Sequence, residues 1–265
     1  MPSLCDTWNS GDPYEYFMGR WSKLVAPVFL QWLNFPDHLS WLDIGCGTGA
    51  LSEAIYYHCK PAHVTCIDPS AELLKKAKER LPGKADCIIG SASHIPKADS
   101  TFDIVVSGLA FNYFPDLNSA FAEMKGVLKK NGTIAAYVWD YADRMDILRL
   151  FWDAAGKVDA NAHKLDQGIR FPICNKDNLR EIFQKAGLAN IETSYLDIDT
   201  IFKNFDDYWN PFFGGQGPAP NYLTSQPNDV QDEIKNNIIK ELFVEQDGSI
   251  KLMARAIAVR GTYKS

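Results

Sequence analysis

The chain has 265 residues, of which 46% are hydrophobic, and this length and composition allow one sizeable core. The formal net charge is -6, which argues against a nucleic-acid partner because phosphate binding requires clustered Lys and Arg. No apolar stretch approaches the roughly 18 to 20 residues that cross a bilayer. We therefore expect a single domain without a membrane span, and these bulk properties leave its oligomeric state open.

The six cysteines are isolated from one another, and no two of them form a C-x-x-C pair. No secretory signal opens the chain. These features are typical of reduced, mostly buried thiols in a cytoplasmic protein, and they predict no metal site. The residues concerned are Cys5, Cys46, Cys59, Cys66, Cys87 and Cys174.

Short apolar runs and helical stripes alternate along the first half of the chain. Residues 1–21 are rich in aromatics, and a helical stripe follows from Leu24 to Leu33, in which Pro27 marks a kink or a late start. Asn131-Gly132 is typical of a helix end. The predicted strands are 41–44, 63–68, 87–90, 102–107 and 133–139, and the predicted helices between them are about 50–59, 70–81 and 117–128.

The pattern is less regular after residue 140. Residues 141–172 contain one apolar helical stripe and a loop, and residues 202–227 are aromatic and end in a glycine-rich loop that is expected to act as a mobile flap over 214–220. The remaining predicted elements are a helix that Gly187 ends, a strand over 188–201, a helix over about 229–244 and a strand over 251–259.

Alternating strands and helices with short connections predict a parallel sheet with right-handed crossovers. Ligands of such sheets bind beyond the carboxyl ends of the strands. This rule places four segments on one rim, namely Gly45 to Gly49, Asp68, Ser91-Ala92 and Gly108-Leu109.

The stretch Trp41-Leu42-Asp43-Ile44-Gly45-Cys46-Gly47-Thr48-Gly49 joins a strand to a helix through three glycines at alternate positions. Glycine is needed where the backbone takes positive φ or where a Cβ would collide with a ligand. The glycines alone also fit a dinucleotide-binding turn. Asp43 separates the two possibilities, because its carboxylate would repel a pyrophosphate but favour a cationic ligand such as the sulfonium and ammonium of S-adenosylmethionine.

Asp68 closes the second strand, 19 positions after Gly49. A carboxylate there can accept hydrogen bonds from both hydroxyls of an adenosine ribose. Both kinds of cofactor contain this ribose, so Asp68 supports an adenosine ligand without choosing between them. The alternative is a helix cap for the helix that starts near residue 70.

The D-x-G-x-G-x-G form of Asp43 to Gly49 resembles the class I S-adenosylmethionine-dependent methyltransferases. The stretches 90–96 and 102–116 are similar to later motifs of that family, although Ser91 stands where Asp is usual. Residues 16–22 look like the start of bacterial enzymes akin to the quinone C-methyltransferases. The resemblance implies a cofactor site made of Tyr16, Arg20, Asp43, Gly45, Cys46, Gly47, Thr48, Gly49, Asp68, Pro69, Ser91, Ala92, Gly108 and Leu109.

The resemblance also implies a Rossmann-like α/β fold with a seven-stranded, mostly parallel sheet whose last strand is antiparallel. The core would comprise about 22–140, 173–201 and 228–265, and a substrate cover about 1–21, 141–172 and 202–227. The aromatic cover suggests a small, apolar or planar methyl acceptor. Candidates for the acceptor pocket are Asn112, Tyr113, Trp139, Trp152, Arg170, Tyr208 and Trp209.

Methyl transfer from a sulfonium is an in-line displacement, for which positioning is the main requirement, and it yields S-adenosylhomocysteine. A general base is needed only when the acceptor must lose a proton, and Asp140 and Tyr141 are weak candidates for that role. Two alternative functions stay open at this point. One is an NAD(P)-dependent oxidoreductase that uses the same glycine turn, and the other is a non-catalytic S-adenosylmethionine-binding module.

Overall fold

The structure is a computed structural model that describes residues 15–214 and 217–264. These residues form two compact units. The smaller unit contains the segments that were expected to cover a substrate, as far as they are described, together with 228–255. The larger unit comprises 22–138, 173–196 and 256–264, and the smaller unit comprises 15–21, 139–172 and 197–255 apart from 215–216.

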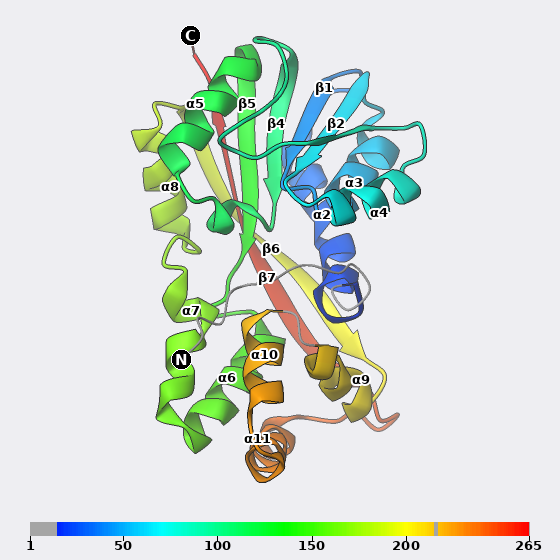
Figure 1. The fold of residues 1–265 in the computed structure, drawn as a ribbon, viewed down its shortest axis with the longest axis vertical. Helices are drawn as coiled ribbons and strands as arrows, with labels where there is room; N and C mark the ends of the chain where they lie inside the picture. The colour runs from blue at the N-terminus through cyan, green and yellow to red at the C-terminus, as the bar shows by residue number, and fades with distance from the viewer. Residues whose placement is uncertain (1–14, 215–216, 265) are drawn as a thin grey trace. The chain divides into compact units, whose positions relative to one another are not determined.

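Seven strands form one sheet in the order β3-β2-β1-β4-β5-β7-β6 (Figure 1). The ladders β1–β2, β1–β4, β2–β3 and β4–β5 are parallel. The strands are β1 (Ser40–Ile44), β2 (His63–Asp68), β3 (Asp86–Ile89), β4 (Phe102–Gly108), β5 (Leu128–Trp139), β6 (Ala189–Phe202) and β7 (Ile250–Thr262).

Helices and shorter helical turns separate most of the strands (Figure 1). Those before β6 are η1 (Glu15–Gly19), α2 (Arg20–Leu33), α3 (Ala50–Cys59), α4 (Ala71–Arg80), η2 (Phe111–Tyr113), α5 (Leu117–Val127), α6 (Asp146–Val158), η3 (Ala160–Leu165), α7 (Gln167–Arg170) and α8 (Lys176–Lys185). Those after it are α9 (Phe205–Trp209), η4 (Asn210–Gly214), α10 (Pro218–Ser225) and α11 (Asn228–Glu241).

The last strand runs antiparallel to β5 in the larger unit. The N–H of Asn131, near the start of β5, donates to the carbonyl of Tyr263 at 3.0 Å, and the N–H of Tyr263 donates back to Gly132 at 2.9 Å. The start of β5 therefore lies beside the end of β7, as expected for antiparallel strands. The predicted seven-stranded, Rossmann-like fold is confirmed.

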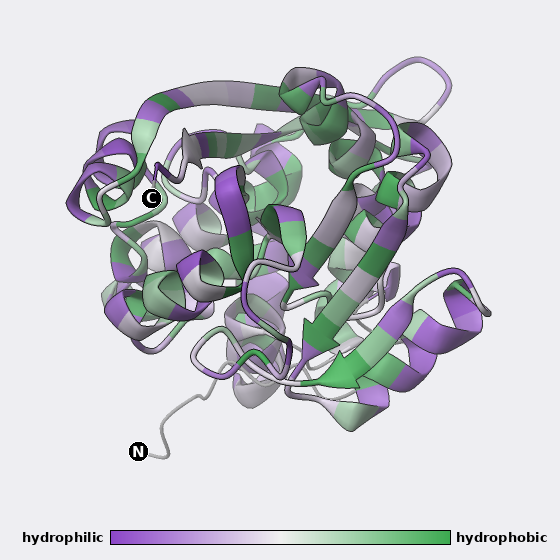
Figure 2. Ribbon diagram, turned by 90° about the horizontal axis from the view of Figure 1, so that it is seen from above, coloured by the Kyte–Doolittle hydropathy of each residue, from purple (hydrophilic) through white to green (hydrophobic). Residues whose placement is uncertain are grey.

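The central strands are buried, and most of their residues are apolar. Ile104, Val105 and Val106 of β4 are at most 1% exposed, which is typical of a parallel strand covered on both faces. Figure 2 shows hydrophobic colour along much of the strands, whereas the helices carry both hydrophobic and hydrophilic residues. Ser70 is the N-cap residue of α4, and its hydroxyl accepts the Leu73 N–H at 3.3 Å.

The helix end at Asn131-Gly132 and the late start at Pro27 were wrong, and the flap over 214–220 stays a prediction. Helix α5 ends at Val127, and Asn131, which has φ 61°, already belongs to β5, because pairing with Tyr263 takes the N–H that a helix end would use. Helix α2 starts at Arg20, so Pro27 lies inside the helix rather than at its start. The proposed flap over 214–220 includes the first turn of α10 from Pro218, and its residues 215 and 216 lie outside the described part of the chain.

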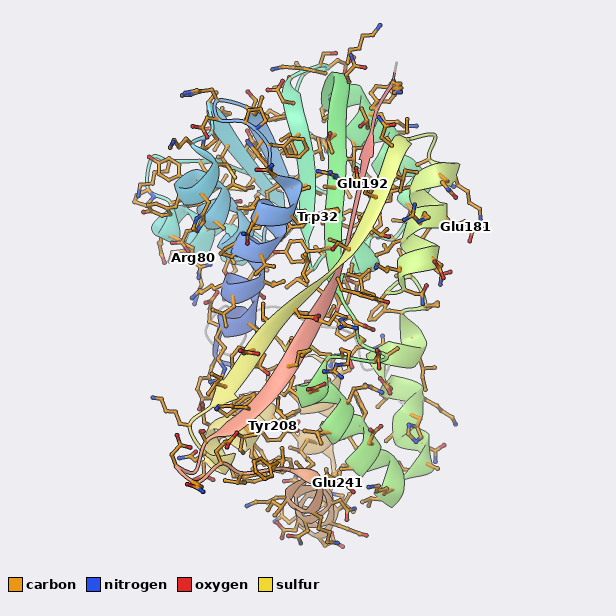
Figure 3. The ribbon with its side chains drawn as sticks, turned by 180° about the vertical axis from the view of Figure 1, so that it is seen from behind. Trp32, Arg80, Glu181, Glu192, Tyr208 and Glu241 are labelled. Carbon is orange, nitrogen blue, oxygen red and sulfur yellow. The ribbon has the colours of Figure 1, made fainter. Side chains whose placement is uncertain are left out.

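One arginine joins three elements of the larger unit. The Arg260 guanidinium on β7 donates to the Leu33 carbonyl at the end of α2 and to the Glu192 carboxylate on β6, both at 2.9 Å. It also lies 5.1 Å from the ring centre of Trp32. Figure 3 labels two of these partners, Trp32 on α2 and Glu192 on β6. The planar, multidonor shape of guanidinium suits these simultaneous contacts better than an ammonium group would.

The core of the smaller unit is aromatic. Phe151 of α6 stacks on Phe212 at 4.8 Å between ring centres, and the Tyr208 hydroxyl donates to the Ile147 carbonyl at 3.0 Å. The Trp152 indole N–H donates to Oε1 of Gln167 at 2.8 Å, and both side chains are buried. These two hydrogen bonds satisfy the polar atoms of Tyr208 and Trp152 within the core.

We expect Trp152→Phe to destabilise the smaller unit, because the Gln167 amide would lose its donor while staying buried. An unsatisfied buried polar group costs about 1 to 3 kcal/mol. Urea unfolding should show a lower midpoint for this variant. The midpoint should partly recover in the double variant that carries Trp152→Phe and Gln167→Leu. A double variant no more stable than the single one would show that this hydrogen bond is not the source of the loss.

Candidate functional site

The glycine turn after β1 is held by the end of β2. The N–H groups of Gly45 and Cys46 both donate to the Ile67 carbonyl, at 2.9 and 3.1 Å, and the N–H of Gly47 donates to Oδ2 of Asp68 at 2.9 Å. Three successive backbone donors are thus used within the protein. Thr48 receives a hydrogen bond from Arg80 at 3.4 Å.

The glycines of this turn are required for two different reasons. Gly45 has φ +71°, and a Cβ there would lie 2.6 Å from the Cβ of Ala110, so packing alone excludes a side chain. Gly47 has φ +54°, but a Cβ there would meet no atom within 4 Å. The space above Gly47 is therefore open to a ligand. Gly49, with φ +87°, is the N-cap residue of α3.

Asp43 is fully buried beneath this turn, near the carboxyl end of β1. Its Oδ2 accepts a hydrogen bond from the Ser52 hydroxyl at 2.6 Å, whereas its Oδ1 has no partner among the described residues. Burial raises the Asp43 pKa to about 7. A cation near Oδ1 would restore the charged form of this carboxylate.

Asp68 connects the glycine turn to α4. Its Oδ1 accepts the Ser70 N–H at 2.8 Å, while Oδ2 accepts the Gly47 N–H. Burial raises the Asp68 pKa in spite of these bonds. The sequence left two roles open for Asp68, a ligand contact and a helix cap. The structure is compatible with both, because the Asp68 carboxylate accepts the Ser70 N–H at the start of α4 and also lies beside the glycine turn. Pro69, which follows, is exposed.

The turn after β3 lies next to Asp68 in space. The Gly90 N–H donates to the Asp68 carbonyl at 3.3 Å, and Ser91 and His94 exchange backbone hydrogen bonds at 3.0 and 3.1 Å. The Ser91 hydroxyl lies 3.3 Å from that of Ser93, and Ala92 is buried. The structure therefore brings Asp68, Ser91 and Ala92 to the ends of neighbouring strands, as the sequence predicted.

The segment after β4 is strained and contains unsatisfied polar groups. Leu109 has φ +60°, a conformation that is unfavourable for a leucine, and its N–H donates to the Tyr137 carbonyl at 2.8 Å. Asn112 on η2 is buried, and neither side-chain amide atom has a hydrogen-bond partner in the described structure. Both features are typical of a ligand-binding loop.

The remaining predicted cofactor residues belong to the smaller unit. Nη1 of Arg20 donates to Oδ1 of Asp207 at 2.8 Å, and its guanidinium lies 4.2 Å from the Trp21 ring centre. Arg20, a predicted cofactor residue, is thus paired with a carboxylate of its own unit. The Tyr16 side chain is half exposed.

Most of the predicted acceptor-pocket residues also belong to the smaller unit. Trp152 and Tyr208 are fully buried, and their polar atoms have the partners described above. Asp140 accepts a hydrogen bond from the Asp143 N–H at 3.3 Å, and burial raises its pKa. Trp139, Tyr141 and Trp209 are buried, Arg170 is half-buried with its guanidinium 5.4 Å from the Phe171 ring centre, and Tyr113 of the larger unit is half-buried.

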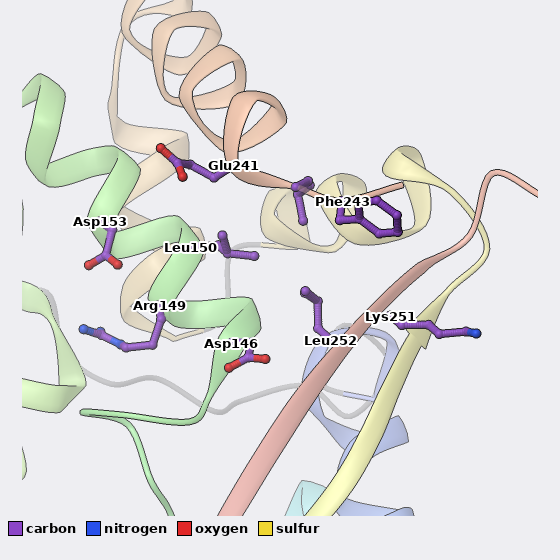
Figure 4. A pocket seen from close by; sticks show the side chains of 9 residues that line it. Asp146, Arg149, Leu150, Asp153, Glu241, Phe243, Lys251 and Leu252 are labelled. Carbon is purple, nitrogen blue, oxygen red and sulfur yellow. The ribbon is translucent and has the colours of Figure 1, made fainter. Parts of the chain in front are cut away.

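The smaller unit also contains a pocket of about 310 Å³ between α6, the end of α11 and β7 (Figure 4). Its charged residues are largely engaged with other groups, because Asp146 accepts the Met253 N–H at 2.9 Å and Arg149 pairs with Asp166. None of the predicted site residues lines this pocket. Its lining residues are Asp146, Arg149, Leu150, Asp153, Glu241, Leu242, Phe243, Lys251 and Leu252.

Several residues that contact the predicted site residues, or lie beside them, were not predicted from the sequence. Ser52 is the partner of Asp43, and its position nine residues later on α3 was a possible signal. Ser107, directly before Gly108, has a buried hydroxyl without a partner in the described residues. Asp207 could not be connected with Arg20, because 187 positions separate them.

Comparison with known proteins supports a methyltransferase. A family model described as a methyltransferase domain matches residues 42–136. The chain is 28% identical to the malonyl-[acyl-carrier protein] O-methyltransferase of Geobacter sulfurreducens, over 57% of this chain and 56% of that protein. It is 29% identical to a demethylmenaquinone methyltransferase of Desulfitobacterium hafniense, over 64% of this chain and 72% of that protein.

Solved structures share the fold. The YcgJ protein of Bacillus subtilis superposes with a TM-score of 0.59 at 17% identity, covering 91% of this chain and 99% of that one. A Haemonchus contortus phosphoethanolamine N-methyltransferase 2, solved with phosphomonomethylethanolamine and S-adenosylhomocysteine, gives 0.57 at 14% identity, covering 96% of this chain and 56% of that one.

Residues 42–136 match a methyltransferase domain, and the predicted class I methyltransferase fold is confirmed. The chain spans about half the length of several curated relatives, for example 56% of one and 47% of another. Among the described helices, none is long and apolar enough to cross a membrane. Within residues 15–214 and 217–264, no group of three or more His, Cys, Asp or Glu side chains could hold a metal ion.

We expect the stability of the protein to fall relative to Asp43→Asn as the pH rises from about 4 to 8. The Asp43 pKa of about 7 in the folded state lies above the ordinary aspartate value of 3.8, so the folded state binds the proton more tightly. This contribution to stability is complete below about pH 4 and is lost as the pH rises from there through 7. The shift corresponds to a relative loss on the order of 4 kcal/mol.

Urea unfolding of both proteins at pH 4, 5, 6, 7 and 8 measures this difference. Asp99→Asn, which changes an exposed carboxylate of the same unit, is the control and should follow the wild type at every pH. A constant stability difference between wild type and Asp43→Asn across this range would contradict the expected titration.

Proposed function

We propose that the chain is an S-adenosylmethionine-dependent methyltransferase that acts on a small, apolar or planar molecule. The observation that carries the proposal is the pairing of an open glycine turn with a buried, half-satisfied carboxylate. Gly47 leaves space for a ligand, and Oδ1 of Asp43 lacks a partner among the described residues. A cationic ligand fits both features, because it would fill the space and offset the cost of burying the Asp43 charge.

The residues present fit this cofactor. Asp68 and the turn at Ser91 and Ala92 would hold its adenosine end, while Asp43 and the strained backbone at Gly108 and Leu109 would hold its methionine end. The bound cofactor supplies an electrophilic methyl group. The chain's own part is to orient the sulfonium and to exclude water from the displacement, and such positioning lowers the barrier.

The arrangement is less suitable for a dinucleotide. A pyrophosphate at such a turn takes its hydrogen bonds from backbone N–H groups near the helix start. In this protein the N–H groups of Gly45, Cys46 and Gly47 already have acceptors within the turn. The Asp43 carboxylate would in addition repel the phosphate charge. No observation favours the oxidoreductase or the non-catalytic binding module.

The methyl acceptor is the less constrained part of the proposal. Asn112 offers a buried donor and a buried acceptor without partners in the described residues, so it is suited to a polar group on an otherwise apolar acceptor. Asp140 is the better of the two weak candidates for a base, because burial raises its pKa. Relatives named for methylation of a malonyl thioester carrier and of demethylmenaquinone are consistent with a small organic group as acceptor.

Thermal and chemical unfolding with saturating ligands tests the cofactor. At about 100 times its Kd, S-adenosylhomocysteine or S-adenosylmethionine should add about 2.7 kcal/mol to the free energy of unfolding. NAD at the same excess should add nothing. Stabilisation by NAD alone would overturn the proposal in favour of the oxidoreductase, and no response to any of the three would also contradict it.

Gly47→Ala tests where the ligand lies. Its methyl group meets no protein atom, so its cost to stability should be only that of a positive φ, about 1 kcal/mol. If the ligand fills the space above Gly47, affinity for S-adenosylhomocysteine should fall at least about tenfold. Isothermal titration calorimetry of the folded variant measures this loss.

Gly187→Ala is the matched control for this variant. Gly187 also belongs to the larger unit, has φ +75°, and a Cβ there likewise meets no atom within 4 Å. Both variants should therefore lose similar stability, but only Gly47→Ala should lose affinity. Equal affinities would exclude contact between the ligand and Gly47. Asp68 is less suitable for such a test, because its carboxylate also supports the turn.

A further inference from the structure

Cys66 and Cys87 lie side by side on neighbouring strands of the larger unit. They are register partners in the parallel β2–β3 ladder, and their Sγ atoms are 3.1 Å apart. Adjacent strands are about 4.8 Å apart, which lies within the Cα separation of about 4.4 to 6.8 Å that a disulfide spans. A bond between the two sulfurs therefore requires side-chain rotation and little movement of the backbone.

A third thiol adjoins this pair. Cys46 in the glycine turn belongs to the same buried cluster as Cys66 and Leu74, and Cys87 packs against that cluster. Cys66 is fully buried, whereas Cys87 is half-buried, so a small reagent can reach the pair from the Cys87 side. Hydrogen bonds from the thiols of Cys46 and Cys87 lower the Cys66 pKa to about 7, which favours a thiolate within the pair near neutral pH.

We propose that Cys66 and Cys87 are a modification site at which hydrogen peroxide forms a reversible disulfide. The thiolate of the pair attacks one peroxide oxygen, the O–O bond breaks, and the hydroxide that leaves takes up a proton to give water. The resulting sulfenic acid is attacked by the second sulfur, the S–O bond breaks, and a second water leaves. In sum, two thiols lose two hydrogen atoms and one peroxide becomes two waters.

The position of this pair connects it with the candidate site. Cys66 stands two residues before Asp68, whose carboxylate holds the Gly47 N–H, and Cys87 stands two residues before Ile89, the register partner of Asp68. The disulfide would thus cross-link the two strands whose ends carry Asp68, Ser91 and Ala92. The formation of the disulfide does not depend on the proposed function.

Peptide mapping of the full chain tests the proposal. The reduced protein is treated with a small excess of hydrogen peroxide, its free thiols are blocked, and it is digested with trypsin. The peptide 85–97 contains only Cys87, and we expect it to be cross-linked to the peptide that contains Cys66, with the loss of two hydrogen atoms. Dithiothreitol should release it, and tandem mass spectrometry assigns the bonded sulfurs.

Single variants separate this pair from the other thiols. The cross-link should disappear in Cys66→Ala and in Cys87→Ala and persist in Cys46→Ala and in Cys59→Ala, the last of which changes a half-buried thiol outside the pair. Absence of the cross-link in the wild type, or a Cys87 cross-link that survives in Cys66→Ala, would overturn the proposal. If Cys66→Ala fails to fold, the fragment assignment in the wild type and the Cys87→Ala variant still decide it.

Discussion

The capture of three successive backbone N–H groups by the end of β2 is the interaction on which the candidate site depends. The Ile67 carbonyl and the Asp68 carboxylate together take the donors of Gly45, Cys46 and Gly47. A turn held in this way must place its glycines at positive φ and deliver the chain to α3 at Ala50. Because β1 and β2 are parallel neighbours, the same bonds fix the distance between the turn and the Asp68 carboxylate.

The burial of the Asp43 carboxylate beside this turn has an electrostatic cost. Asp43 is fully buried with one hydrogen bond from Ser52, and its pKa near 7 shows that the folded protein disfavours the charge. Cores normally exclude a carboxylate without a full set of partners. A destabilised group of this kind is typical of functional sites, where a ligand supplies the missing interaction.

Much of the larger unit could be predicted because its signals are local. The strand before Gly45, the Ser70 cap and the apolar run of β4 each depend on residues close in sequence. The contacts that could not be predicted join distant segments, such as Arg20 with Asp207 and Cys66 with Cys87. Asn131 shows the same limit, because its local pattern favours a helix end while pairing with Tyr263 makes it part of a strand.

Several buried polar atoms without partners lie at one end of the central strands of the larger unit. In the larger unit, Oδ1 of Asp43, the Ser107 hydroxyl and both amide atoms of Asn112 have no hydrogen-bond partner in the described structure. All three residues lie at or just beyond the carboxyl ends of β1 and β4. These two strands are parallel neighbours, and Asp43 of β1 is the register partner of Val106 of β4. An unsatisfied carboxylate, hydroxyl and amide at one end of two adjacent strands favour a ligand that brings donors and a positive charge there, as a sulfonium with an ammonium group does.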